Sequence, residues 1–327
     1  MQVEEDILGP GYEAIVLPME DDDEGEVVAT LVRRRAPGGS RRAVLYLHGF
    51  TDYFFQTHLA DFFTAKGINF YALDLRKYGR SLRPHQTRGL VRSVTDYFPE
   101  LDEAVRVIRE LDGNDHLILN AHSTGGLVAS LWADRVRGRG RVQALILNSP
   151  FLDLNVPAPV RGLADLIKRG VARAPVRAVL PIVLTTAYGM SLHTDHHGEW
   201  TYDLEWKPIE GFAVHATWIG AIRRAQRRLH AGLAVDVPVL VMCASKGLRL
   251  TAYTPEAMEA DVVLDPAQIA LWSTSIGPHV TCVRIPNGVH DLVLSAKPVR
   301  ARVFDQMDRW MTTFADTQAH PPAMETT

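Results

Sequence analysis

Short apolar runs recur along the chain and predict buried strands. They are rich in valine, isoleucine and leucine and do not alternate with polar positions, which is typical of parallel strands covered on both faces. The runs span residues 27–31, 43–47, 70–73, 117–121, 144–147, 239–244 and 280–285. Helical patterns lie between them, so we expect a mostly parallel sheet with helices on both sides. In such sheets ligands bind at the carboxyl ends of the strands.

Apolar residues at helical spacing predict the helices between the strands. One stripe is closed by Gly113, which suits a left-handed C-terminal cap, and consists of Leu101, Ala104, Val105, Ile108 and Leu111. A last helix is predicted from about Pro298 to Phe314, because proline suits a first helical turn. The polar residues 317–327 are expected to form a disordered tail.

The pattern changes between residues 150 and 233. This stretch contains helical segments and no clear buried strand. Its large aromatic residues include Trp200, Tyr202, Trp206, Phe212 and Trp218. We interpret it as a helical lid, or cap, inserted into an α/β core that consists of residues 1–149 and 234–316.

Composition and charge narrow the class of partner. The 327 residues are 46% hydrophobic, which suffices for a sizeable core, and 35 Lys and Arg nearly balance 38 Asp and Glu. This balance supplies no overall electrostatic field that would attract nucleic acid or an anionic membrane.

No stretch approaches the roughly 18 apolar residues of a membrane span. Both Cys243 and Cys282 lie in apolar runs, where thiols serve as small core side chains. We expect a cytoplasmic protein with a small-molecule substrate, no nucleic-acid partner and no stable membrane insertion.

The chain after the run 117–121 indicates a strand, a tight turn and a helix. It reads Ala121-His122-Ser123-Thr124-Gly125-Gly126, followed by apolar residues at helical spacing. In a G-x-S-x-G elbow a serine occupies a strained turn at the top of a sheet, and small neighbours let other backbone segments approach. Ser123 takes the place of that nucleophile, although Ala121 replaces the first glycine. The alternative is a serine that only caps a helix.

Two backbone amides are the expected donors to the oxyanion that forms in acyl transfer. The run 43–47 ends in His48-Gly49-Phe50, where enzymes with a serine elbow direct a backbone N–H at the reacting carbonyl oxygen. The N–H of Phe50 is one candidate donor, and the N–H of Thr124, directly after the nucleophile, is the other. We expect a structural role for His48.

One of the thirteen histidines has the context of a general base. His290 follows the last strand run, within Asn287-Gly288-Val289-His290-Asp291, and therefore lies on a loop beyond a strand end. Serine needs a neighbour that accepts its proton, and imidazole titrates in the right range. We assign His290 as this base.

The third member should be a carboxylate between Ser123 and His290, since the elbow fold presents its residues in the order serine, acid, histidine. Asp261 and Asp265 compete for the role. Asp265 precedes a proline and has a glutamine three positions later, which is the signature of a helix N-cap. Asp261 lacks this signature, so we assign it to orient the imidazole, with Asp265 as the alternative.

Several blocks together resemble the α/β-hydrolase superfamily and, within it, the serine aminopeptidase S33 and monoacylglycerol lipase or lysophospholipase-like group. They are His48-Gly49-Phe50, the Ser123 elbow, Gly288-Val289-His290-Asp291 and residues 74–81, which resemble D-x-R-G-x-G-x-S. The resemblance covers about residues 25–315. It departs from the family at Lys77-Tyr78 and at an extra segment, residues 245–260, before Asp261.

The resemblance implies an α/β-hydrolase fold with about eight strands and a helical lid insertion. It also implies a serine carboxylic ester hydrolase that works through an acyl-enzyme. The aromatic lid favours an ester with an apolar acyl group, such as a monoacylglycerol. The same residues would serve amide, peptide or thioester hydrolysis, or acyl transfer to an alcohol. A non-catalytic ligand-binding homologue is a further alternative.

Neither a cofactor nor a metal is predicted. The chain contains no G-x-x-x-x-G-K motif and no strand-linked G-x-G-x-x-G motif, which would cradle phosphates or a dinucleotide. The cluster of His193, Asp195, His196 and His197 lacks a complete set of metal ligands, so we interpret it as a solvated loop.

Four arginines recur on one predicted helix, Arg223, Arg224, Arg227 and Arg228. The opposite side of this helix carries apolar residues. We therefore expect the arginines to form an exposed surface face.

Overall fold

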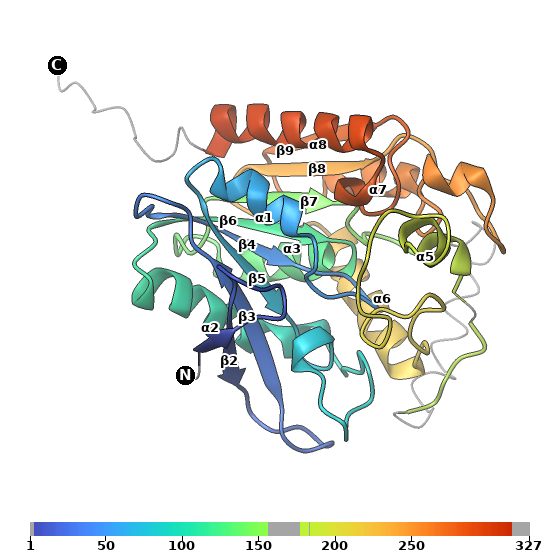
Figure 1. Cartoon of the computed structure of the whole chain (residues 1–327), viewed down its shortest axis with the longest axis horizontal. Coiled ribbons are helices and arrows are strands. Elements are labelled where there is room, and N and C mark those ends of the chain that lie inside the picture. Colours follow the sequence, from blue (N-terminus) through green and yellow to red (C-terminus); the bar gives the residue numbers. More distant parts are fainter. Residues whose placement is uncertain (1–2, 156–176, 183, 316–327) are drawn as a thin grey trace.

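The computed structural model describes residues 3–155, 177–182 and 184–315, which form a nine-stranded sheet flanked by helices (Figure 1). The strand order is β1-β2-β3-β5-β4-β6-β7-β8-β9. The bounds are β1 Val3–Glu5, β2 Glu13–Pro18, β3 Val28–Arg34, β4 Arg42–Leu47, β5 Asn69–Asp74, β6 His116–His122, β7 Ala144–Asn148, β8 Val239–Ala244 and β9 Val280–Ile285. Pairing is parallel from β5 through β9 and antiparallel among β1, β2, β3 and β5. The predicted mostly parallel α/β sheet is confirmed.

All seven apolar runs are strands, and two further strands escaped the sequence analysis. The missed strands, β1 and β2, form the antiparallel edge of the sheet. All three residues of β1 are exposed, and β2 mixes buried with partly exposed positions. The exposed β1 contains no continuous apolar run. β2 does contain one, Ala14–Leu17, and could have been found by the same signal.

Helices flank the sheet where apolar stripes occur in the sequence. Those of the described residues are α1 Thr57–Thr64, α2 Phe98–Arg106, α3 Thr124–Val136, α5 Thr186–Leu192, α6 Ala216–His230, α7 Pro266–Ser273 and α8 Lys297–Trp310. A π-helical turn extends α2 to Leu111, and another extends α8 to Ala315. The last predicted helix is therefore confirmed, with Pro298 in its first turn.

The two faces of the sheet bury separate apolar cores. Successive residues of a strand point to opposite faces, so Leu45 belongs to one core and Tyr46 to the other. The first core is covered by α2, α3, α6 and α7, with Trp132 of α3 fully buried. The second is covered by α1 and α8, with Phe63 of α1 fully buried. Burial on both sides holds the strands that carry the candidate site.

The parallel register brings several strand ends to one edge of the sheet. Leu47 of β4 pairs with Ala121 of β6, and Ala121 pairs with Leu147 of β7. The helices α5 and α6, from the stretch 150–233, lie beyond this carboxyl edge (Figure 1). The predicted tail, 317–327, lies outside the described residues.

The block after β5 is held by a buried carboxylate. The Asp74 side chain accepts hydrogen bonds from the backbone N–H of Phe54 at 2.9 Å and from the Arg80 guanidinium at 2.8 Å. The same guanidinium donates to Asp6 at 2.8 Å. The Ser81 hydroxyl donates to the Asp74 carbonyl at 2.7 Å. This motif therefore fixes a loop beside the candidate site.

The departure at residues 77 and 78 has a structural explanation. Lys77 has a positive φ of 64° and is buried, and its ammonium lies 2.6 Å from both Asp22 and Glu24. The ring of Tyr78 is buried against His48, with 4.9 Å between the ring centroids. Both side chains thus join the N-terminal loop and the β4 turn to this block.

The prediction that both thiols are core side chains is wrong for Cys282. Cys243 on β8 is buried, whereas Cys282 is exposed because β9 is an edge strand. No helix within the described part of the chain has the length and apolar character needed to cross a bilayer.

Replacement of the buried guanidinium should test how much this network stabilises the fold. In Arg80→Met two buried carboxylates, Asp6 and Asp74, lose their partner, so we expect the free energy of unfolding in urea to fall by about 3–5 kcal/mol. Arg41→Met removes an exposed pair with Asp115 and should change it by less than about 1 kcal/mol. Equal losses in the two variants would contradict a stabilising role for the buried network.

Candidate active site

Ser123 occupies a strained turn between β6 and α3. Its φ and ψ are 51° and −119°, a conformation rarely adopted by residues other than glycine. Small neighbours permit the turn: a Cβ on Gly125 would lie 2.7 Å from the Leu47 carbonyl oxygen, and one on Gly126 would lie 2.6 Å from the Pro150 Cβ. The Ser123 side chain makes no capping hydrogen bond to α3. The helix-cap alternative therefore does not describe this serine.

His290 lies within hydrogen-bonding distance of Ser123. Its Nε2 is 3.0 Å from the Ser123 Oγ, and its Nδ1 is 2.9 Å from the Asp261 Oδ2. All three residues are buried. A proton on Nδ1, donated to the carboxylate, leaves the Nε2 lone pair directed at the hydroxyl. The arrangement can accept a proton from Ser123.

A tight loop holds His290 between β9 and the 3₁₀ turn Leu292–Leu294. Asn287 has a positive φ of 58°, and a Cβ on Gly288 would meet the Leu292 side chain at 2.6 Å. Asp291 accepts hydrogen bonds from the side chains of Gln56 at 3.1 Å and Asn148 at 2.7 Å. Asp291 thus anchors the loop and does not contact the imidazole nitrogens.

The extra segment 245–260 does not displace Asp261. The N–H of Asp261 donates to the Lys246 carbonyl at 3.0 Å, and the N–H of Leu248 donates to the Asp261 carbonyl at 2.8 Å. The segment therefore leaves the end of β8 and returns to it as a closed loop. Asp261 Oδ1 also accepts the N–H groups of Val263 and Leu264, each at 2.8 Å. These bonds fix the carboxylate while its other oxygen faces His290.

Asp265, the alternative acid, has a different environment. Its Oδ1 accepts the backbone N–H of Ala267 at 3.0 Å, and it is the N-cap of α7. The structure therefore places Asp261, not Asp265, against His290.

The turn after β4 lies against the serine. A Cβ on Gly49 would be 2.9 Å from the Ser123 Cβ, so the backbone of the candidate donor Phe50 starts beside Ser123. Thr124 is the first residue of α3, where backbone N–H groups have no partner within the helix. His48 accepts the N–H of Leu75 on its Nε2 at 3.0 Å, which is a structural contact.

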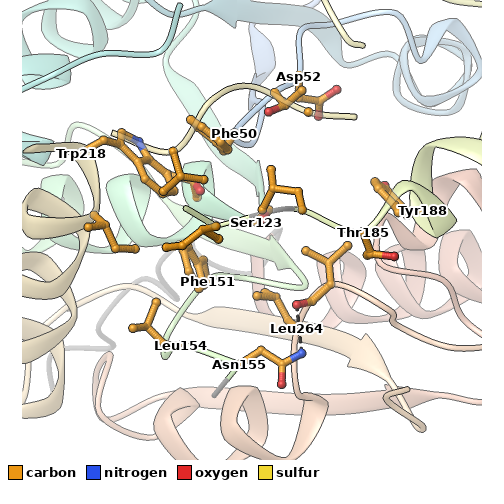
Figure 2. A pocket seen from close by; sticks show the side chains of 18 of the residues that line it. Phe50, Asp52, Ser123, Phe151, Leu154, Asn155, Thr185, Tyr188, Trp218 and Leu264 are labelled. Atoms are coloured by element: carbon orange, nitrogen blue, oxygen red, sulfur yellow. Dashed lines mark hydrogen bonds between the residues drawn. The ribbon is translucent and has the colours of Figure 1, made fainter. Parts of the chain in front are cut away.

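A large apolar cavity opens above Ser123, with a volume of about 1280 Å³. Phe50 and Trp218 lie on one side of Ser123, and Tyr188 lies on the other (Figure 2). Phe151 and Leu264 form another wall. Much of the lining comes from the stretch 150–233, including Trp218 and Tyr202 among its predicted aromatics. The other aromatics of that stretch, Trp200, Trp206 and Phe212, are not among the described lining residues.

Sequence analysis missed a buried ion pair in the cavity wall. The Lys207 ammonium lies 2.7 Å from Asp52 Oδ1, and both side chains are buried. Burial alone would raise the pKa of Asp52, but the charge and hydrogen bond of Lys207, together with the charges of His122 and His48, hold the pKa below its ordinary value. Asp52 Oδ2 has no hydrogen-bond partner among the described residues. No local signal marks this pair, because its members are far apart in the sequence.

Two histidines of the cluster around His193 contact other described residues. His193 Nδ1 accepts the N–H of Asp195 at 3.1 Å, and its Nε2 is 3.3 Å from the Tyr202 carbonyl. The ring of His197 stacks on Tyr253 with 3.8 Å between centroids. Asp195, His196 and His197 are exposed, as a solvated loop predicts, but the interpretation is wrong for His193, which is buried.

The arginines of α6 are not a simple surface face. Arg223, Arg224 and Arg227 line the cavity, whereas Arg228 points to Asp134, at 3.1 Å from its Oδ2. The predicted exposure is confirmed for Arg224, Arg227 and Arg228, whereas Arg223 is partly buried. That three of the arginines also border the cavity was not predicted, because the periodicity of a helix does not show which of its polar sides borders a cavity.

A parallel sheet flanked by helices, with a serine on the elbow between β6 and α3, defines an α/β-hydrolase. Within this class the chain belongs to the serine aminopeptidase S33 family, whose sequence profile matches residues 38–254. The predicted resemblance to this family is confirmed. No curated protein sequence shows significant similarity to the chain.

Solved structures share the fold at low sequence identity. A soluble variant of the Saccharomyces cerevisiae monoglyceride lipase, bound to a substrate analog, is 17% identical, with a TM-score of 0.65 over 91% of this chain and 95% of that one. The Paleococcus ferrophilus monoacylglycerol lipase is 16% identical, with a TM-score of 0.61 over 86% of this chain and 98% of that one. A thermophilic esterase from Thermogutta terrifontis is 17% identical, with a TM-score of 0.53 over 92% and 99%. These similarities establish the fold.

Removal of the Lys207 charge should destabilise the protein. Lys207→Met leaves the buried Asp52 carboxylate unpaired, so the free energy of unfolding at neutral pH should fall by about 3–5 kcal/mol. The double variant Asp52→Asn/Lys207→Met should recover most of this loss. Since the folded-state pKa of Asp52 lies below its ordinary value, the wild-type contribution should be present at neutral pH and disappear as the pH falls through the acidic range. A double variant as unstable as Lys207→Met would contradict this account.

Proposed function

We propose that this protein is a serine hydrolase that cleaves carboxylic esters with an apolar acyl group, such as monoacylglycerols. The observation that carries the proposal is the hydrogen-bonded series Ser123, His290 and Asp261 at the wall of a large apolar cavity. A concave apolar site buries most of a ligand and leaves a few polar groups to orient it. The monoglyceride lipases among the similar folds support this class of substrate.

The proposed reaction begins with attack of Ser123 Oγ on the ester carbonyl carbon. His290 Nε2 takes the hydroxyl proton, and Asp261 holds the ring and stabilises the imidazolium. The backbone N–H groups of Phe50 and Thr124 donate to the oxygen that becomes negative. His290 then gives its proton to the departing alcohol, which leaves the acyl group on Ser123. Water, deprotonated by the same histidine, releases the acid and restores the serine.

The stretch 150–233 serves in this proposal as a cap over the carboxyl edge of the sheet. Trp218 and Tyr188 reach the cavity from α6 and α5, so the cap would set which acyl groups fit. The two cysteines are free thiols, which agrees with the reducing environment of the cytoplasm.

Peptide hydrolysis is the second candidate, because the family is described as serine aminopeptidases. An aminopeptidase must bind the free ammonium of its substrate, and a carboxylate in the cavity would be the natural partner. Asp52 is the sole carboxylate among the described lining residues, and Lys207 already neutralises it. This pairing favours the ester over the peptide.

A panel of p-nitrophenyl esters of increasing chain length tests the proposal, beside a monoacylglycerol and a peptide p-nitroanilide. The wild type should hydrolyse the esters and react with a fluorophosphonate probe. Ser123→Ala should lose both activities, because no other described residue takes the place of the nucleophile. Turnover of the anilide alone would replace the esterase assignment with a peptidase. An unlabelled, inactive wild type would indicate a binding protein.

Two aspartate variants test the proposed acid. Asp261→Asn keeps the shape of the side chain but favours the wrong imidazole tautomer, so kcat should fall by about 10⁴-fold. Asp265→Asn is the matched control, because asparagine also caps helices, and should leave kcat nearly unchanged. Steady-state kinetics with one ester suffices. Similar kcat values for the two variants would remove Asp261 from the mechanism.

A further inference from the structure

Positive charge gathers at one part of the cavity. Five cationic side chains and one carboxylate line it among the described residues. The Lys207 ammonium forms an ion pair with Asp52, the one carboxylate of this described lining. The remaining cations are Arg92, Arg223, Arg224 and Arg227.

Two of these arginines have acidic partners and two do not. Arg92 lies 2.8 Å from Asp23, and Arg223 lies 2.8 Å from Asp153. Arg224 donates to the backbone carbonyl of Arg92 at 2.6 Å, which leaves its charge without a counterion in the described structure. Arg227 forms no ion pair with any described residue. Among the described residues, two positive charges therefore border the cavity without a counterion.

The spacing of these two arginines on α6 favours an anion between them. Residues three apart lie side by side on a helix surface, where like charges repel. The helix α6, Ala216–His230, contains no acidic residue that could offset the repulsion. Two guanidinium groups together can donate several charge-assisted hydrogen bonds to a carboxylate or a phosphate. Both side chains are exposed to solvent, and both also border the cavity that holds Ser123, so an anion in the cavity can reach them.

The arginines lie at a defined separation from the reacting centre. Trp218 stacks on Phe50, with 4.0 Å between ring centroids, and so marks the end of α6 near Ser123. A rise of 1.5 Å per residue places Arg227 roughly 13 Å further along the helix axis. The lining between them includes Ile219 and Gly220 and is apolar over its first turn. The wall of α6 is thus apolar near the serine and cationic at its far end.

We infer that Arg224 and Arg227 form a subsite for an oxyanion at the far end of the substrate. The inference rests on the proposed esterase function and specifies its substrate class: esters whose acyl chain ends in a carboxylate or a phosphate. The apolar part of the chain contacts the cavity wall, and the terminal anion reaches the two guanidinium groups. An acyl chain that is too short to span the separation gains nothing from its terminal charge.

The test compares p-nitrophenyl esters that differ only at the far end of the acyl chain. The first set ends in a carboxylate, the second in a phosphate, and the third in a carboxamide, which is neutral and similar in shape to the carboxylate. Chain lengths run from short to long in each set. For wild type, kcat/KM should favour an anionic end over the carboxamide by about tenfold at the best chain length, and added salt should reduce this preference.

Variants on the same helix separate the subsite from a general charge effect. Arg224→Met/Arg227→Met should bring the anion-to-carboxamide ratio close to one, because kcat/KM falls more for the anionic esters than for the carboxamide esters. Arg228→Met is the matched control, because Arg228 pairs with Asp134 outside the cavity, and should keep the wild-type ratio. A ratio unaffected by the double variant, or lowered equally by the control, would overturn the inference.

A binding measurement keeps the inference distinct from the proposed reaction. Calorimetry on Ser123→Ala should show tighter binding of an alkyl ester whose acyl chain ends in a carboxylate than of the same ester ending in a carboxamide, and Arg224→Met/Arg227→Met in that background should abolish the difference. If the wild type hydrolyses none of the esters but this binding difference is present, the esterase proposal fails and the anion subsite stands. Equal binding of the two ligands would overturn the subsite whatever the enzyme hydrolyses.

Discussion

The close approach of two backbone segments, the turn after β4 and the first turn of α3, is the constraint on which the site depends. A Cβ at Gly125 would clash with the carbonyl oxygens of Leu47 and His48, and a Cβ at Gly49 would clash with Ser123. This contact places the strained serine next to both candidate oxyanion donors. The parallel register of β4, β6 and β7 makes the contact possible, because it ends these strands at one edge. Burial of the sheet on both faces then holds the strained turn in place.

Buried charges fix the loops around that contact. Asp74 with Arg80, Lys77 with Glu24, and Asp52 with Lys207 join segments that are distant in the sequence. Removing charged groups from water is costly, so such pairs are weak sources of net stability. Their effect on the arrangement of the loops is stronger. A buried charge without its partner is strongly unfavourable, so each pair holds its two segments in one relative position. The departure from the family pattern at Lys77-Tyr78 can be understood in this way.

The cavity combines a rigid floor with a wall from the stretch 150–233. Its floor consists of elements of the sheet core, which carry Ser123 and His290, and its wall includes Tyr188 of α5 and Trp218 of α6. In the proposed function, reaction chemistry and substrate choice therefore belong to different parts of the chain.

The sequence by itself determined the fold class, seven strands, the last helix and the serine turn, because burial on both faces, helical periodicity and small residues at tight turns leave local patterns. It also separated Asp261 from Asp265 on one local feature, the helix cap, and the structure places Asp261 beside His290. Tertiary structure alone decided the Asp52–Lys207 pair, the exposure of Cys282 and the arginines that border the cavity. These features depend on which distant segments pack together and on which strand lies at the edge of the sheet. The periodicity of residues along the chain contains no information on either.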